Sequence, residues 1–113
     1  MKKTKMLKKN YEFKNVLSKG KYYSGKNIEA FIKDNNKSFN FLGLAISVKT
    51  GKAVKRNKIK RLIRENYKIL EPQIMNGKNI VFLWKKKVDT EKATFENIKE
   101  AMNNIFEKAN IKV

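Results

Sequence analysis

The strongest chemical signal in this chain is a run of cations at Lys52–Arg64, which reads K-A-V-K-R-N-K-I-K-R-L-I-R. Seven of these thirteen positions are Lys or Arg, and none is acidic. Cations at this density bind polyanions, because each phosphate contact releases counterions. Apolar residues interrupt the run at helical spacing, which a disordered basic tail would not need. The run therefore predicts a folded helix that meets a polyanion.

A helical wheel with about 100° per residue separates this segment into two arcs. The cationic arc holds Arg56, Asn57, Lys60, Arg61, Arg64 and Lys68, and the apolar arc holds Ile59, Leu62, Ile63, Asn66 and Leu70. A merely solvated helix would mix Glu with Lys, since like charges four residues apart repel. We therefore favour polyanion binding. Asn57 leaves two interpretations open: a helix cap, or a hydrogen bond to a phosphate, a 2′-hydroxyl or a hydrated metal.

Length and charge narrow the class of protein. The chain has 113 residues, which suits one domain, and a formal net charge of +18 with a pI of about 10.1. Such self-repulsion favours an anionic partner, with nucleic acid first and an anionic membrane surface second. No apolar run approaches the roughly 20 residues of a membrane span, and no signal-peptide core follows the first residues. We expect a soluble, cytoplasmic protein without a membrane partner.

Several catalytic chemistries are disfavoured by composition. The chain has no Cys and no His, which removes disulfides, thiolate zinc sites and the commonest general base. Its ten Asp and Glu residues are scattered, so a carboxylate metal cluster is not expected. We expect no catalytic side chains, no metal site on the protein and no small-molecule cofactor.

The first half of the chain predicts one helix and two strands. Residues 1–9 read as a mobile basic arm, and Asn10 as the cap of a helix over about residues 10–19 that ends at Gly20. Residues 21–33 read as a strand after a turn near Gly25. Asp34–Ser38 reads as a hairpin turn, and Phe39–Val48 as a buried strand, followed by a loop at Lys49–Lys52.

The second half predicts a helix, a strand and a helix. The basic helix should begin at Val54 or Lys55 and end at Leu70, just before Pro72. Asn79–Trp84 reads as another buried strand, and Thr94 as the cap of a last helix. The order α-β-β-α-β-α predicts a single α+β domain over residues 1–113 with a small central sheet.

Three segments resemble one known family. Gly51–Glu65, G-K-A-V-K-R-N-K-I-K-R-L-I-R-E, closely resembles the signature of the bacterial ribonuclease P protein component. Leu42–Lys49 is similar to the strand before that signature, and Phe13–Gly20 to the family's first helix. The resemblance covers roughly residues 5–70, and the last strand and helix agree in type. It implies that the basic helix lies in a left-handed crossover, which opposes the usual right-handed preference.

The resemblance also implies an activity. Ribonuclease P is an endonuclease that removes the 5′ leader from precursor tRNA, and its catalytic subunit is an RNA that holds Mg²⁺ at the scissile phosphate. The implied partners are therefore the ribonuclease P RNA and precursor tRNA. The implied role of the protein is to bind both, with no catalytic residue and no metal ligand of its own.

Site residues follow from the same resemblance. The contacts to the catalytic RNA would come from Lys52, Arg56, Asn57, Lys58, Lys60, Arg61 and Arg64. A cleft for the single-stranded leader would be lined by Phe13, Leu17, Phe31, Ser47 and Lys49. Single strands suit such a cleft, because bases stack on aromatic rings and the backbone follows positive charge. For Phe13 and Leu17, plain core packing is an equal alternative.

The chain departs from the family's usual pattern at several positions. Lys58 stands where Arg is usual, Val48 replaces a Lys, and Leu17 stands where an aromatic is common. Glu29 is acidic beside the expected cleft. The main alternative function is another RNA-binding module, such as a ribosomal protein or an RNA chaperone. An autonomous nuclease and a membrane-surface binder are weaker alternatives.

Overall fold

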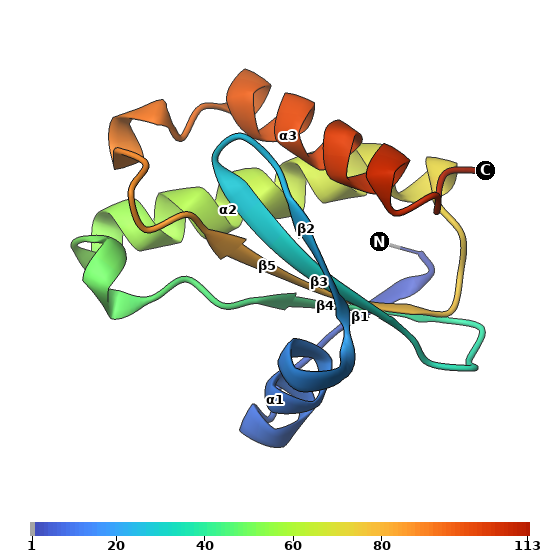
Figure 1. The fold of residues 1–113 in the computed structure, drawn as a ribbon. Coiled ribbons are helices and arrows are strands. Elements are labelled where there is room, and N and C mark those ends of the chain that lie inside the picture. The colour runs from blue at the N-terminus through green and yellow to red at the C-terminus, as the bar shows by residue number, and fades with distance from the viewer. Residues whose placement is uncertain (1) are drawn as a thin grey trace.

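The structure is a computed structural model that describes residues 2–113. Its strands are β1 (Thr4–Met6), β2 (Lys21–Ser24), β3 (Ile28–Asp34), β4 (Asn40–Leu44) and β5 (Lys78–Trp84). Its helices are α1 (Asn10–Lys19), α2 (Ala53–Leu70) and α3 (Phe95–Lys108), with 3₁₀ turns η1 (Val48–Thr50), η2 (Glu71–Gln73) and η3 (Thr90–Lys92). The sheet lies between α2 and α3 on one side and α1 on the other (Figure 1). The predicted α+β class with a central sheet is confirmed.

Residues 2–113 form one mixed sheet with the strand order β1-β4-β5-β3-β2. β4 runs parallel to both β1 and β5, whereas β3 runs antiparallel to both β5 and β2. Helix α2 connects the parallel neighbours β4 and β5, so the basic segment lies in a crossover between adjacent strands, as the resemblance implied.

Helix boundaries agree closely with the sequence pattern. α1 spans the predicted residues and ends at Gly20, and α2 begins one residue before Val54 and ends at Leu70. Thr94 caps α3 as predicted, since its hydroxyl oxygen accepts a hydrogen bond from the Asn97 N–H at 3.2 Å. Caps of this type satisfy backbone N–H groups that have no partner inside the helix.

The predicted cap of α1 is wrong by one residue. The N-cap is Lys9 rather than Asn10. The Glu12 carboxylate reaches back and accepts hydrogen bonds from the backbone N–H groups of Lys8 and Lys9, at 3.2 and 2.9 Å. A negative charge at this end of a helix is favourable, because the helix dipole is positive there.

The predicted mobile arm at residues 1–9 is also wrong for the part that the structure describes; Met1 lies outside the described residues. Thr4–Met6 forms β1 and pairs in parallel with β4. Thr4 and Leu7 are buried, and the Thr4 hydroxyl is 2.7 Å from the Tyr67 hydroxyl of α2. Most other positions of the segment are lysines, so its composition does not indicate this short strand.

The predicted single strand at residues 21–33 divides into β2 and β3, which pair antiparallel around the turn near Gly25. The hairpin predicted at Asp34–Ser38 is wrong, because β5 lies between β3 and β4. Ile80, Val81 and Phe82 of β5 are fully buried. A strand buried on both faces belongs in the middle of a sheet, which decides the pairing against the local turn signal.

The main core lies between the sheet and the helix pair α2 and α3. Alternate residues of β3 and β5 point into it, as the two-residue period of a strand requires. They are Ile28, Ala30, Ile32, Ile80, Phe82 and Trp84. The helices contribute Ile59, Ile63 and Tyr67 from α2 and Ile98, Met102 and Phe106 from α3. This core holds α2 against the sheet and leaves its cationic arc outside.

Candidate nucleic-acid interface

The cationic arc of α2 faces solvent, as the wheel predicts. Lys52, Asn57, Lys58 and Arg61 are exposed, and Arg56, Lys60 and Arg64 are half-buried. Ile59, Leu62, Ile63 and Leu70 on the opposite arc are buried. Packing of the apolar arc therefore fixes the rotation of the helix and presents the cations together on one surface.

Most of these cations have no acidic partner. Within residues 2–113, no ion pair is formed by four of them, which are Lys52, Lys58, Lys60 and Arg64. Arg61 lies 3.7 Å from Glu65 one turn later, and both side chains are about half exposed, so this pair is weak. The charge of the arc is therefore available to an external polyanion.

Arg56 has a structural contact in addition to its place on this surface. Its guanidinium donates a hydrogen bond to the Gly51 carbonyl at 2.6 Å. This bond ties the turn before α2 to the first turn of the helix. Arg56 therefore orients the basic end of α2 as well as adding charge to it.

Asn66 is the polar residue on the apolar arc, and the structure explains it. Asn66 is fully buried, and its amide donates to the Leu62 carbonyl at 3.0 Å and to the Phe95 carbonyl of α3 at 3.2 Å. The side chain thus joins α2 to the start of α3. The position of Asn66 on the helical wheel predicts that the side chain is buried. Its hydrogen bond to α3 depends on how the two helices pack and could not be predicted from the sequence.

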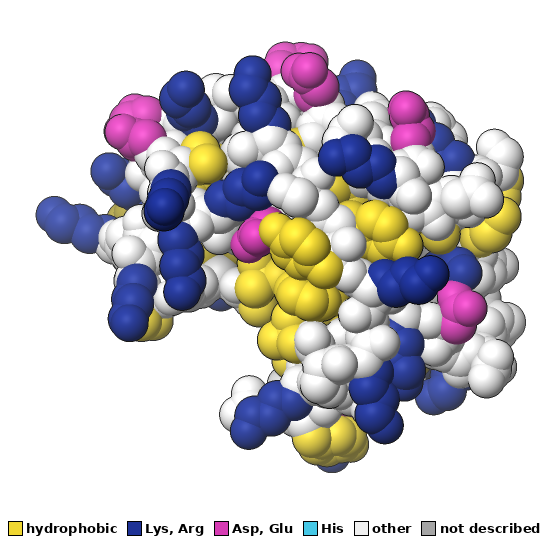
Figure 2. Space-filling view, in the orientation of Figure 1, with side chains coloured by type: hydrophobic (Ala, Val, Ile, Leu, Met, Phe, Trp, Pro, Cys, Tyr) yellow, Lys and Arg dark blue, Asp and Glu magenta, His cyan; other side chains and the backbone are white. Residues whose placement is uncertain are grey.

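The predicted leader cleft lies on the other side of the sheet. Leu7, Val16 and Val81 form a small second core there. The predicted residues Phe13, Leu17 and Phe31 pack against this core and remain half-buried. Figure 2 shows hydrophobic side chains exposed in a hollow between α1, at the bottom, and the basic N-terminal end of α2, at the left. The structure thus brings the three residues together, and they combine core packing with exposed apolar surface.

Sequence reasoning missed further residues of this cleft. Tyr22 of β2 stands opposite Phe31, with ring centroids 5.3 Å apart, and Leu83 of β5 stands opposite Glu29. Ala45 also packs against the second core. The strand register that brings these residues together depends on which strands pair, and the predicted hairpin gave the wrong pairing.

The acidic residue in the cleft is engaged by a neighbour. The Tyr22 hydroxyl donates a hydrogen bond to the Glu29 carboxylate. This bond raises the pKa of the Tyr22 hydroxyl above its usual value of 10.0. The Glu29 carboxylate therefore already accepts a hydrogen bond from within the protein.

The sequence predicts Ser47 and Lys49 at the end of a strand, but in the structure both residues lie beyond the end of that strand. β4 ends at Leu44, and both residues are exposed around the turn η1. The Ser47 hydroxyl oxygen caps this turn, accepting a hydrogen bond from the Lys49 N–H at 3.2 Å. The two side chains stand between the end of β4 and the start of α2, and neither belongs to the apolar cluster of the cleft.

Within residues 2–113, no group of three or more His, Cys, Asp or Glu side chains is placed to hold a metal ion. Among the helices of the same range, none combines the length and the apolar character that crossing a membrane requires.

Comparison with known proteins gives consistent matches. The family model described as Ribonuclease P matches residues 1–110. The ribonuclease P protein component of Clostridioides difficile is 33% identical over 111 residues, covering 97% of this chain and 96% of that one. The Clostridium botulinum (strain 657) protein of the same name is 37% identical over 106 residues, covering 93% and 94%.

Solved structures agree with these matches. The Staphylococcus aureus RNase P protein superposes with a TM-score of 0.82 at 29% identity, covering 94% of this chain and 95% of that one. The RNase P protein of Thermotoga maritima gives a TM-score of 0.82 at 26% identity, covering 92% and 96%. With the match of the family model along nearly its whole length, the chain belongs to the family of bacterial ribonuclease P protein components.

Proposed function

We propose that this chain is the protein subunit of a ribonuclease P that removes the 5′ leader from precursor tRNA in the cytoplasm. In this role it binds the ribonuclease P RNA through α2 and the leader through the cleft beside α1. The observation that carries the proposal is the presence of both surfaces, one cationic and one aromatic, on opposite sides of one sheet in a chain of this family.

The α2 surface is suited to folded RNA. Its cations project from one rigid helix whose other arc is locked into the main core. Lysine and arginine side chains in such an array contact phosphates and position a protein without reading sequence. Four of the cations lack an acidic partner within residues 2–113, so an RNA would not first have to displace a carboxylate from them.

The cleft is suited to a single strand. Phe13, Phe31 and Tyr22 present aromatic surface beside the aliphatic side chains of Leu17 and Leu83. Unpaired bases stack on such surface with little dependence on sequence. The basic N-terminal end of α2 borders the hollow in Figure 2 and supplies positive charge for the sugar–phosphate backbone, and Lys49 lies in the turn η1 just before this helix. This chemistry fits a leader, which is single-stranded and varies in sequence.

The cleavage chemistry is assigned in this proposal to the RNA subunit, with Mg²⁺ held mainly by that RNA. Support comes from the chain's composition, which includes no His and no Cys. The protein's own contribution would be to neutralise phosphate charge and to hold the leader. No small-molecule cofactor and no membrane partner enter the proposal.

A cleavage assay at low magnesium tests the function. The protein is mixed with a bacterial ribonuclease P RNA and precursor tRNA, and the rate is compared with that of the RNA alone. We expect faster removal of the leader with the protein. A rate no better than that of RNA alone would overturn the proposal, and binding without stimulation would favour another RNA-binding role. Cleavage by the protein without RNA would instead assign the chemistry to the protein.

A variant of Arg64 tests the α2 surface. Replacing Arg64 with Gln removes one charge, and we expect the slope of log affinity for the ribonuclease P RNA against log salt to fall by about 1. The matched control is Lys99→Gln, which removes one charge from α3. Equal slopes for both variants would remove Arg64 from the interface.

A further inference from the structure

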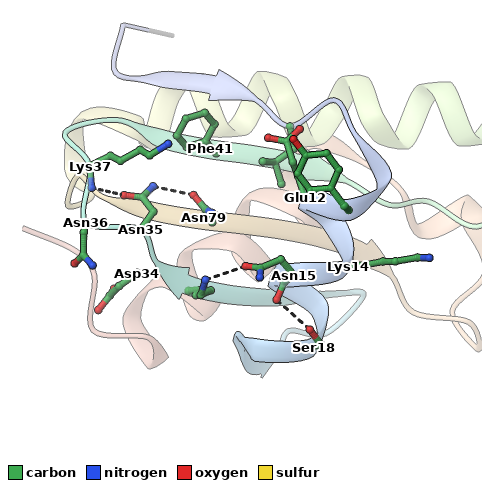
Figure 3. A pocket seen from close by; sticks show the side chains of 13 residues that line it. Glu12, Lys14, Asn15, Ser18, Asp34, Asn35, Asn36, Lys37, Phe41 and Asn79 are labelled. Atoms are coloured by element: carbon green, nitrogen blue, oxygen red, sulfur yellow. Dashed lines mark hydrogen bonds between the residues drawn. The ribbon is translucent and has the colours of Figure 1, made fainter.

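A second groove opens on the side of α1 that faces away from the predicted leader cleft. It has a volume of about 650 Å³ and lies between α1 and the turn at residues 35–37. Figure 3 shows α1 with Asn15 and Lys14 on one side, the turn with Asn35 and Lys37 on the other, and Phe41 and Asn79 on the sheet between them. Phe13 and Leu17, which belong to the leader cleft, do not line this groove.

The floor of the groove is one row across three neighbouring strands. Phe41 of β4 pairs in register with Asn79 of β5, and Asn79 pairs in register with Lys33 of β3. Side chains at paired positions project from the same face of a sheet at roughly 4.5–5.5 Å spacing. An aromatic ring, an amide and an ammonium group therefore stand side by side. These are the groups that stack a base, bond its edge and contact a phosphate.

The amides of the groove are held in place by neighbours. The Asn35 amide donates to the Asn79 side-chain oxygen at 2.8 Å and to the Phe39 carbonyl at 3.0 Å. Lys33 Nζ donates to the Asn15 side-chain oxygen at 2.8 Å. These bonds use the oxygens of Asn79 and Asn15 and orient their NH₂ groups as donors for a ligand. A site whose polar groups are already oriented loses less entropy when it binds.

The charge of the groove is positive once its acids are accounted for. Glu12 accepts hydrogen bonds from the backbone N–H groups of Lys8 and Lys9, and Asp34 pairs with Lys78 at 2.5 Å. Both carboxylates are thus engaged by groups that do not line the groove. The lining cations are Lys14, Lys33 and Lys37. Three cations beside two engaged carboxylates favour an anionic ligand.

We propose that this groove binds an unpaired nucleotide from the upstream part of the leader, beyond the segment in the cleft. The base stacks on Phe41, the Asn79 amide bonds its edge, and Lys33 contacts a phosphate. Lys37, whose Nζ lies 5.3 Å from the Phe41 ring centroid, moves aside to a neighbouring phosphate. This inference rests on the proposed function, since it extends the path of the same strand.

Geometry favours the leader over the ribonuclease P RNA as the source of this nucleotide. The groove and the cleft share one face of the sheet and are separated only by α1, whereas α2 packs on the other face. A helix with its side chains is about 10–12 Å across, a distance that a few extended nucleotides span. Lys14 is exposed on α1 and lines the groove, so it lies along this path.

The test compares two precursor tRNAs, one whose leader fills the cleft only and one whose leader is longer by several nucleotides. Phe41→Leu keeps apolar bulk and removes the aromatic face. We expect it to weaken binding of the long-leader precursor by about fivefold or more, the low end for loss of one base stack, and to leave the short-leader precursor unchanged. The matched control is Phe39→Leu, an exposed aromatic that does not line the groove.

An equal effect of Phe41→Leu on both precursors, or no effect on either, would overturn the inference. Because Phe41 also packs against the second core, Lys33→Gln provides a second variant. It should lower the salt slope by about 1 for the long leader only, relative to Lys108→Gln at the end of α3. Phe31→Ala in the cleft separates the two proposals. If Phe31→Ala weakens leader binding and the groove variants do not, only the groove proposal fails. If neither Phe31→Ala nor any groove variant weakens leader binding, the proposed leader-binding function fails as well.

Discussion

The two faces of the sheet differ in how completely they are covered. On one face, α2 and α3 together bury a continuous core that includes Phe82, Tyr67 and Phe106 with no exposed surface. On the other face, the cluster that α1 buries is small within residues 2–113, consisting of Leu7, Val16 and Val81, and the surrounding apolar side chains stay partly exposed. We call these the closed face and the open face. The same strands build both, because alternate residues point in opposite directions.

This difference separates stability from binding. A closed core with few voids is stabilised by close packing, and its residues have no surface left to offer a ligand. The open face keeps aromatic and aliphatic surface accessible on both sides of α1, where the proposed leader path runs. The cations of α2 lie outside the closed face, so RNA binding there is compatible with complete burial of the opposite arc. A small chain can thus hold two ligand surfaces on one well-packed core.

The largest effect on stability is expected from a cavity in the closed face. Phe82→Ala removes a fully buried ring that packs edge-on against Phe106 at 6.1 Å between centroids. We expect the free energy of unfolding to fall by about 3–5 kcal/mol, as is typical when a buried aromatic side chain is removed. Urea unfolding followed by circular dichroism measures it. If Phe82→Ala lowered the free energy of unfolding by less than any variant on the open face, the distinction between the two faces would be contradicted.

A smaller effect is expected where α1 meets the open face. Gly43 of β4 allows close approach, since a Cβ atom there would lie 2.5 Å from the Phe13 ring and 3.0 Å from a Leu7 methyl. Gly43→Ala should push α1 outward, lower the free energy of unfolding by about 1–3 kcal/mol and weaken leader binding. The matched test is Gly43→Ala with Phe13→Leu, which makes room for the added methyl. Failure of the second change to restore stability would show that the contact does not position α1.

Phe31→Ala sharpens the comparison, because it should affect binding more than folding. Phe31 is half-buried on the open face, so its loss should destabilise the fold less than Phe82→Ala does. Loss of a stacking platform should weaken binding of precursor tRNA by about fivefold or more, with mature tRNA little affected. The control is Phe95→Ala, a half-buried aromatic packed against the closed face. Equal loss for precursor and mature tRNA would remove Phe31 from the leader cleft.

Much of this arrangement is predictable from sequence where the signal is local. The spacing of Ile59, Leu62 and Ile63 predicts which arc of α2 is buried, and Thr94 predicts the start of α3. The long motif at Gly51–Glu65 identifies the family. Each of these signals is contained in one segment, so no knowledge of strand pairing is needed.

What sequence reasoning missed depends on pairing between distant segments. The strand Thr4–Met6 is stabilised by β4 and by Tyr67 of α2, and both of these partners are distant from the strand in the sequence. The insertion of β5 between β3 and β4 overrides the turn at Asp34–Ser38. The row of Lys33, Asn79 and Phe41 exists only in that register, so no local pattern predicts the second groove.

The smallest expected effect is the response of α1 to acid. Hydrogen bonds from the backbone N–H groups of Lys9 and Lys8 hold the pKa of the Glu12 carboxyl below its usual value of 4.5. A carboxyl whose pKa is lowered by folding stabilises the fold above its unfolded pKa, and this contribution is lost as pH falls through the folded value. Protonation of Glu12 should therefore loosen the start of α1 in moderate acid while leaving the closed face intact.

Hydrogen exchange distinguishes the faces in this experiment. Between about pH 5 and pH 3, the stability of the wild-type protein against exchange at the Val16 and Leu17 amides of α1 should fall, after correction for intrinsic rates, relative to that at the Met102 amide of α3. Glu12→Gln should lower this stability at neutral pH and flatten its further change in acid, whereas Glu100→Gln on α3 should behave like wild type. A uniform loss at α1 and α3 would mean that the open face has no independent response, because its helix would then detach only when the whole domain unfolds.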